Sequence, residues 1–277
     1  MRKFKSVLAS VVLSGGFWAA GFWAAGPALA GDLAAPGASD LSDDKINDII
    51  QNFAAKEAEF ARARENYTYR QTARVQSLTE EGTPTGKWEM VSDIVFTPDG
   101  KRTERVVYSP VSTLTEFYLS PEDMEDLRSV QPFVLTTTEL PKYWIRYLGR
   151  QRVDEIGCYV FAVKPKKLEP GKRYFQGEVW VDDKDLQIVK TYGRGVGLLK
   201  RNEDQAFPKF ETYREQIDGK FWFPTYTAAN DTLHFKERDV RMKETVRYED
   251  YKQFKASSTI TFGDAVEDKK DPPAKKP

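Results

Sequence analysis

The stretch RYFQGEVWVDDKDLQIVKTYG, which runs from Arg173 to Gly193, decides how the rest of the chain must fold. Apolar residues stand on both sides of an acidic centre at Asp182–Asp185, and this pattern predicts two strands joined by a turn. Both arms carry apolar residues at alternate and at adjacent positions. We therefore expect a β-hairpin that needs cover on both of its faces, with a covered inner face that includes Trp180.

Residues 1–30 have the features of an export signal. Basic residues at the start precede an apolar run from Val7 to Ala25, and Ala28-Leu29-Ala30 has the small-x-small pattern of a cleavage site before Gly31. An uncleaved membrane anchor is the alternative, because the run approaches the about 18 apolar residues that a spanning helix needs. We expect a cleaved signal peptide at residues 1–30 and export across the inner membrane.

Composition narrows the class of protein. Cys158 is the only cysteine, so we expect no internal disulfide and no lipid-attachment cysteine after the cleavage site. Without the three basic residues of the signal, 39 Lys and Arg stand against 42 Asp and Glu. A balance so close to neutral argues against nucleic acid as a partner.

Two helices are predicted. After a short linker at residues 31–40, Ser42 is a candidate N-cap for a helix from Asp43 to Arg64, in which Glu57 interrupts an apolar stripe. The stripe consists of Ile46, Ile49, Ile50, Phe53 and Phe60. Ser120 followed by Pro121 predicts a second, short helix that ends at about Leu127.

Alternating apolar residues dominate the chain from Tyr67 onward and predict about eleven strands joined by short turns. Among them we expect strands at 114–119 and 133–138. So many consecutive antiparallel strands indicate one large curved sheet, an unclosed barrel covered by the two helices, within a single domain at residues 41–262. The tail at residues 263–277 is Lys- and Pro-rich and is expected to be disordered.

No pattern of catalytic residues stands out. His234 is the single histidine, which excludes most triads and histidine metal sites, and Cys158 lies in a predicted strand as a small buried thiol. The acidic turn at Asp182–Asp185 lacks the glycine and distal glutamate of a calcium loop. Gly193–Gly197 is expected to be a flexible connection. We therefore predict no enzyme activity, no metal and no cofactor.

With no catalytic pattern, the aromatic and apolar residues of the predicted strands are the residues that bear on function. They either fill a core or line an apolar cavity beneath a sheet too wide for its own side chains. The residues that we expect to line such a cavity are Trp88, Met90, Ile94, Phe96, Phe133, Trp144, Phe161, Trp180 and Trp222.

The order of these elements resembles that of a known family. The turn at Pro98-Asp99-Gly100-Lys101, the short helix after Ser120, the stretch YFQGEVWVD at Tyr174–Asp182 and DGKFWFP at Asp218–Pro224 are similar to the outer-membrane lipoprotein-sorting proteins, the family of the periplasmic lipoprotein carrier LolA. The resemblance runs from about Lys45 to Phe254.

The resemblance implies a monomeric periplasmic carrier without a cofactor. An unclosed barrel would enclose an apolar cavity that receives lipoprotein acyl chains from an inner-membrane transporter and delivers them to an outer-membrane acceptor. The helix Asp43–Arg64 would be a lid that can lift, and an arginine of an early strand, Arg70 or Arg74, would tie it to the barrel. An added basic loop at Lys164–Arg173 distinguishes this chain from the shorter carriers.

Two other functions stay open. A regulatory module of the same fold, similar to the RseB-type envelope-stress sensors, would bind a protein partner and sense lipid. An enzyme acting on envelope lipids would require carboxyl groups that converge inside the cavity with strongly raised pKa values.

Overall fold

The computed structural model describes residues 40–97, 99–198 and 208–254, all within one compact unit, Ala34–Pro277. The predicted signal peptide, the tail at residues 263–277 and all of the predicted linker except Asp40 lie outside the described residues. Within the described ranges, no helix has both the length and the apolar character needed to span a membrane.

Both predicted helices are present. α1 (Asp43–Arg64) begins after Ser42, whose hydroxyl accepts a hydrogen bond from the Lys45 amide at 3.3 Å. α2 (Pro121–Glu125) begins with a capping box, in which Ser120 and the side chain of Asp123 bond each other's backbone amides. The chain then continues into a π-helical turn, η1 (Asp126–Val130), so the second helix extends beyond the expected end.

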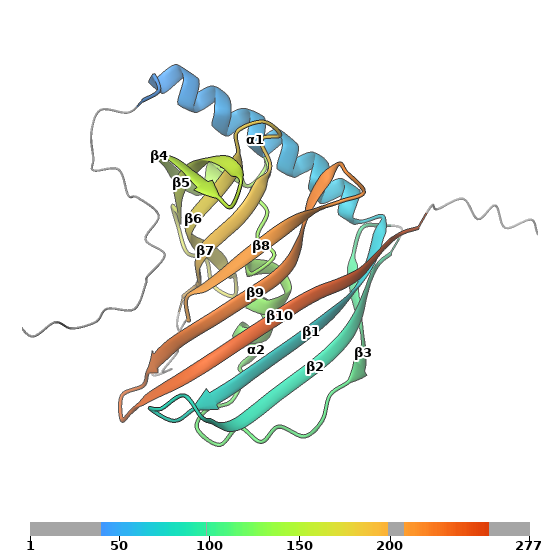
Figure 1. Cartoon of the computed structure of the whole chain (residues 1–277), viewed down its shortest axis with the longest axis vertical. Coiled ribbons are helices and arrows are strands. Elements are labelled where there is room, and N and C mark those ends of the chain that lie inside the picture. Colours follow the sequence, from blue (N-terminus) through green and yellow to red (C-terminus); the bar gives the residue numbers. More distant parts are fainter. Residues whose placement is uncertain (1–39, 98, 199–207, 255–277) are drawn as a thin grey trace, which may run out of the picture. The chain divides into compact units, whose positions relative to one another are not determined.

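All the strands of the described chain form one antiparallel sheet, which Figure 1 shows as a curved layer, and a short 3-10 turn, η2 (Leu140–Lys142), precedes its edge strand. Its strands are β1 (Tyr67–Leu78), β2 (Pro84–Phe96), β3 (Arg102–Tyr108), β4 (Tyr143–Val153), β5 (Ile156–Pro165), β6 (Tyr174–Asp182), β7 (Ile188–Val196), β8 (Phe210–Ile217), β9 (Phe221–His234) and β10 (Asp239–Gln253). They lie in the order β3-β2-β1-β10-β9-β8-β7-β6-β5-β4, so β3 and β4 are unpaired edges and the sheet does not close.

The predicted fold class is confirmed, with two differences. Residues 114–119 and 133–138 were expected to be strands and form irregular backbone instead. Leu135 is nevertheless fully buried, because this segment packs against the inner face of the sheet without pairing to it. The described residues therefore contain ten strands where about eleven were expected.

The hairpin at Arg173–Gly193 is confirmed as β6 and β7, which pair with Glu178 opposite Tyr192. Its acidic centre is a turn. The Lys184 amide donates a hydrogen bond to the Asp182 carboxylate at 2.6 Å, and Leu186 adopts a positive φ of 52°. The Asp182 carboxylate is therefore used to close the turn.

Both faces of this hairpin are covered, as its pattern predicted. On the inner face, Val179 and Val181 join a large core beneath the buried side of α1, which includes Phe53. On the outer face, Trp180 and Val189 belong to a separate cluster with Cys158, Val160 and the partly buried Trp222. Successive residues of this part of β6 belong alternately to these two clusters, because neighbouring side chains of a strand point to opposite faces of the sheet.

Candidate functional site

A buried ion pair holds α1 against the sheet. Arg214 on β8 donates to both carboxylate oxygens of Glu57 at 3.0 and 3.2 Å, and both side chains are shielded from solvent. The same glutamate accepts the Ile188 amide at 3.2 Å, and Arg214 also donates to the Phe133 carbonyl. Burial raises the pKa of Glu57, while the Arg214 charge and these hydrogen bonds oppose that rise.

The expectation that Arg70 or Arg74 ties α1 to the sheet is wrong. Both side chains are nearly half exposed and form ion pairs with the neighbouring strand β2, Arg70 with Asp93 at 2.8 Å and Arg74 with Glu89 at 2.9 Å. They alternate along β1 with the buried residues of the inner face, so they project from the outer face. Arg214 takes the role that was assigned to them.

The turn η1 is fixed inside the curve of the sheet by a second buried ion pair. Arg173, which precedes β6, donates from Nε to the Asp126 carboxylate at 2.8 Å. Burial nevertheless raises the pKa of Asp126 to about 6. Gly195 makes this arrangement possible, because a Cβ at that position would overlap the Asp126 carboxylate. The stretch Gly193–Gly197, expected to be a flexible connection, is thus mostly part of β7.

Glu244 is a second buried acid beneath this segment. It accepts a hydrogen bond from the side chain of Gln131, and burial raises its pKa to about 7, with smaller contributions from Asp123 and Asp126. The Thr212 hydroxyl donates to the Gln131 carbonyl at 3.0 Å. These contacts anchor the end of η1 to β8 and β10.

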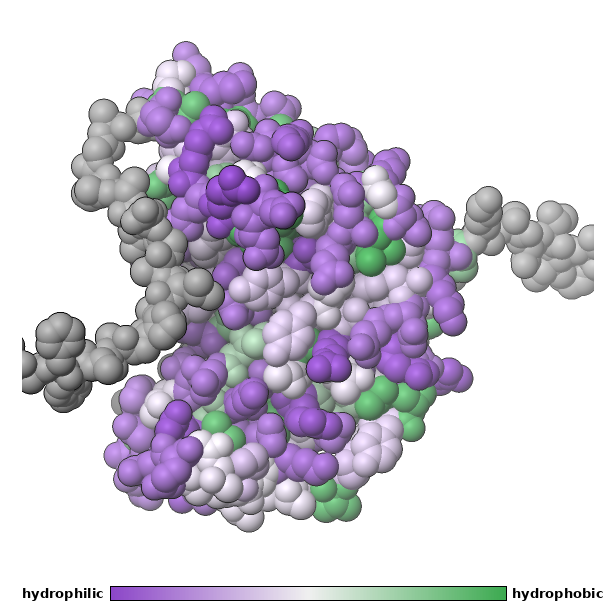
Figure 2. Space-filling model, viewed as in Figure 1, coloured by the Kyte–Doolittle hydropathy of each residue, from purple (hydrophilic) through white to green (hydrophobic). Residues whose placement is uncertain are grey.

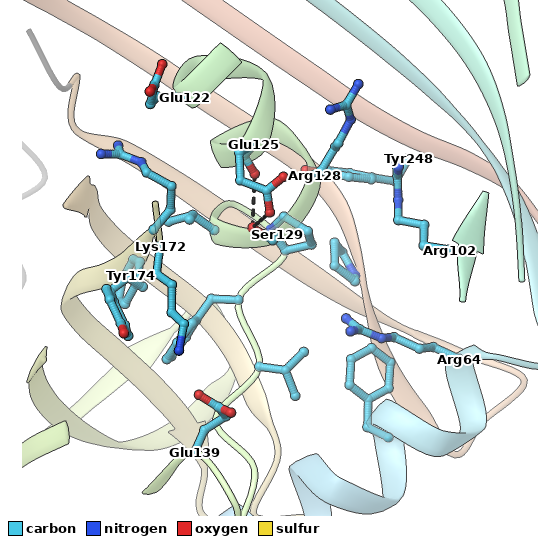
Figure 3. A pocket seen from close by; sticks show the side chains of 18 of the residues that line it. Arg64, Arg102, Glu122, Glu125, Arg128, Ser129, Glu139, Lys172, Tyr174 and Tyr248 are labelled. Atoms are coloured by element: carbon cyan, nitrogen blue, oxygen red, sulfur yellow. Dashed lines mark hydrogen bonds between the residues drawn. The ribbon is translucent and has the colours of Figure 1, made fainter. Parts of the chain in front are cut away.

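A cavity of about 1190 Å³ lies between the C-terminal end of α1, the α2–η1 segment and the inner face of the sheet. Figure 3 shows the charged and polar side chains around it, with Arg64 coming from α1, Arg102 from β3 and Lys172 from the opposite side. Its apolar and aromatic wall is formed by Phe60, Tyr69, Phe96, Val130, Phe133, Val134, Tyr143, Tyr174, Phe175, Leu198, Phe223, Tyr248 and Tyr251.

The aromatic rings of this wall contact one another. Phe133 stacks on Phe175 with ring centroids 4.6 Å apart, and Tyr69 stacks on Tyr251 at 5.1 Å. Phe223 contacts the Tyr251 ring at 4.8 Å. Such contacts fix the positions of the rings, so the wall is rigid around the space that it encloses.

A second cavity, of about 840 Å³, lies on the other side of α2 and shares Pro121 and Glu122 with the first. Its wall combines apolar residues such as Phe210 and Met242 with the carboxyl groups of Asp126 and Glu244.

The structure brings only some of the expected cavity residues together. Phe96 and Phe133 line the larger cavity. Phe161 and Ile94 are fully buried, and Trp88 and Met90 are partly buried on β2.

The other three tryptophans lie elsewhere. Trp180 and Trp222 belong to the outer-face cluster, so their assignment to the cavity wall is wrong. Trp144 is 66% exposed on the edge strand β4, where Lys166 lies over its ring at 4.9 Å. Because the neighbours of Trp180 on β6 are also apolar, the sequence pattern does not show on which face of the sheet Trp180 lies. The structure places it on the outer face.

The apolar stripe of α1 packs as expected. Ile49 and Phe53 are buried in the large core, against which Ile46 and Ile50 also pack, whereas Phe60 is buried in a separate cluster with Tyr67 and Phe223. Phe60 alone of the five lines the larger cavity.

Sequence reasoning missed the residues that define this cavity. Arg64 ends α1, and Tyr248 and Tyr251 lie on the last strand, far from the hairpin in sequence. For Tyr248, the sequence held a signal: apolar and polar residues alternate along β10, and this alternation places Val246 and Tyr248 on the inner face.

The titratable groups around the two cavities are mostly engaged with one another. Among the described residues, no group of three or more His, Cys, Asp or Glu side chains is arranged to hold a metal ion. Two carboxyl groups with raised pKa values are already engaged, Asp126 by Arg173 and Glu244 by Gln131. Burial raises the pKa of the Cys158 thiol to about 12, so it is not a nucleophile near neutral pH.

No protein-family model and no curated protein sequence matches the chain. Solved structures that are similar to it include a DUF1329 family protein from Desulfovibrio piger, with 11% identity and a TM-score of 0.38 over 76% of this chain and 94% of that one. A putative outer membrane lipoprotein-sorting protein domain from Vibrio parahaemolyticus has 11% identity and a TM-score of 0.34, over 74% and 93%. MucB has 13% identity and a TM-score of 0.27, over 75% and 94%.

Proposed function

We propose that this chain is a periplasmic carrier that holds the acyl chains of lipoproteins, or another lipid, in the larger cavity. The observation that carries the proposal is a volume of about 1190 Å³ whose wall combines aromatic rings with charged side chains. Ligand sites for small molecules occupy about 300–1,000 Å³, so this cavity offers room for a long apolar chain.

The energetics of such a site suit a carrier. Burying about 15 methylenes gains on the order of 12 kcal/mol relative to water, at about 0.8 kcal/mol for each methylene. Relative to a membrane the gain is near zero, because an acyl chain in the bilayer is already out of contact with water. An aromatic wall that only matches the membrane in its affinity for an acyl chain can therefore both accept and release its cargo. We propose an inner-membrane transporter as the donor and an outer-membrane protein as the acceptor.

Binding of a fluorescent fatty acid to the purified protein tests this proposal, together with solvent extraction of lipid from protein isolated from its own cells. Val134 lies in the cavity wall, so Val134→Trp should fill part of the space and weaken binding at least about tenfold. Val107→Trp is the matched control, because Val107 is 45% exposed on the edge strand β3. Protein that carries no lipid and ignores the fatty acid would refute the proposal.

One feature favours a sensor or assembly role as the second candidate. The edge strand β3 exposes Val106, Val107 and Tyr108, and Figure 2 shows hydrophobic residues gathered over this edge at the lower right. An open edge with apolar side chains can pair with a strand of another protein. Crosslinking from β3 in cells would favour this role if it captured one partner and if Val107→Lys disturbed envelope signalling without displacing any lipoprotein.

A further inference from the structure

Arg64 differs from the other basic residues that line the larger cavity. Five of the six have a carboxylate at ion-pair distance: Arg102 and Arg128 share Glu104, Lys142 pairs with Glu139, Lys172 with Glu169 and Arg173 with Asp126. Among the described residues, Arg64 forms no ion pair and donates no hydrogen bond. Within residues 40–97, 99–198 and 208–254, no carboxylate lies at ion-pair distance from this cation at the cavity.

The surroundings of Arg64 make that cation costly to leave unpaired. Its guanidinium carbon lies 6.0 Å from the centroid of the Phe60 ring, and Figure 3 shows the side chain directed into the cavity. Burial lowers the pKa of Arg64, and the neighbouring carboxylates of Glu57 and Glu65 oppose this only through space. An oxyanion in the cavity would supply both the charge and the hydrogen-bond acceptors that are missing.

A second guanidinium on the same side of the cavity has unused capacity. Arg102 donates to Gln71 at 3.0 Å and lies 3.5 Å from Glu104, while its Nε is buried without a hydrogen-bond partner. Glu104 must also balance Arg128, at 3.1 Å. Two arginines thus depend on one carboxylate, next to an Arg64 that has none.

We propose that the ligand of this cavity is an amphiphile with an anionic head, a carboxylate or a phosphate, which binds Arg64 while its acyl chain lies along the aromatic wall. The inference rests on the proposed function and adds the chemical class of the head group. Phe133, Phe175 and Phe223 supply the apolar part of the wall, and Arg102 lies close enough to the same region to contribute a second donor.

Competition against a bound fluorescent fatty acid distinguishes the contribution of the head group to affinity from that of the acyl chain. The full chain is titrated with palmitate, lysophosphatidylglycerol and uncharged hexadecanol. Arg64→Met should weaken the anionic ligands about tenfold, the effect of losing one charge-assisted hydrogen bond, and leave hexadecanol unchanged. Arg62→Met is the matched control, because Arg62 is exposed in the same last turn of α1 and lies outside the cavity wall. It should change none of the three.

Arg64→Lys keeps the charge and should restore part of the affinity, which a merely structural role for Arg64 would not predict. A loss confined to palmitate identifies a carboxylate head, and a loss confined to lysophosphatidylglycerol a phosphate head; either supports the inference. If Arg64→Met weakens hexadecanol as much as the anionic ligands, or weakens none of the three ligands, the inference is overturned while carrier function stands. If no ligand binds even the wild-type protein, the proposed function itself has failed.

Discussion

Two charged residues of α1, Glu57 and Arg64, lie two turns apart on the side of the helix that faces the sheet, and their surroundings differ. Glu57 is fully buried and receives four hydrogen bonds, three from Arg214 and one from the Ile188 amide. Arg64 borders the cavity over the Phe60 ring and has neither an ion pair nor a hydrogen bond among the described residues. The fold therefore uses one charge for its own cohesion and leaves the other available to a ligand.

The largest expected effect is on the Glu57 side of this comparison. Arg214→Met would leave Glu57 as a buried charge without a counter-ion, so we expect the free energy of unfolding to fall by about 3–5 kcal/mol. Urea denaturation followed by circular dichroism measures the loss. The double variant Glu57→Leu/Arg214→Met should recover part of it, because no charge then remains buried alone. A loss below about 1 kcal/mol in the single variant would show that the pair does not hold α1.

Glu244 extends the comparison to a carboxyl group with no cation beside it. Its pKa is raised to about 7, so its protonated form stabilises the fold fully below the ordinary pKa near 4.5. That stabilisation is lost as the pH rises through about 7, and amounts to on the order of 3 kcal/mol.

Glu244→Gln imitates the protonated form and should remove this pH dependence. The difference in unfolding free energy between the variant and the wild type should grow in the variant's favour from pH 5 to pH 8. Parallel curves over that window would contradict a raised pKa in the folded protein. Asp126, whose pKa is raised to about 6, is present in both proteins, so most of its own titration cancels in the difference.

Arg64→Met should have a much smaller effect on stability than Arg214→Met. The variant loses a favourable interaction with the helix C-terminus of about 0.3–1 kcal/mol and gains relief from a partly buried, unpaired charge. We expect a change within about 1 kcal/mol, measured by thermal and urea unfolding without ligand. A loss like that of Arg214→Met would place Arg64 among the residues that hold the fold together.

The smallest effect is expected for the surface pairs of β1. Arg74→Ala removes an ion pair with Glu89 in which the arginine is nearly half exposed, and such pairs contribute about 0–1 kcal/mol. Unfolding free energies of the variant and the wild type should agree within about 0.5 kcal/mol at 0.5 M salt, where the pair is screened. A loss above about 2 kcal/mol would restore Arg74 as a tether.

The elements of the fold were predictable because they follow local patterns. The helical stripe of α1, the cap at Ser42 and the alternation of β6 and β7 each show in a few consecutive residues. The segments at 114–119 and 133–138 were misread because an apolar run indicates burial, and burial against the inner face does not require strand pairing.

The site was less predictable because its contacts join distant parts of the chain. Glu57 and Arg214 are 157 residues apart, and in the sequence Glu57 is only an interruption of an apolar stripe. Trp180 was assigned to the wrong face because Val179, Trp180 and Val181 are all buried, so the apolar pattern of β6 does not show which of its two faces is the inner one.

The Glu57–Arg214 pair also bears on how often α1 could leave the sheet. Lifting the helix would separate the two charges from each other. It would also break the hydrogen bond of the Ile188 amide to Glu57 and disturb that of the Phe133 carbonyl to Arg214. With a free-energy cost of about 3–5 kcal/mol for separating the pair, the form with α1 lifted would account for roughly one molecule in 10² to 10⁴. We therefore expect α1 to cover the sheet in nearly every molecule at any moment.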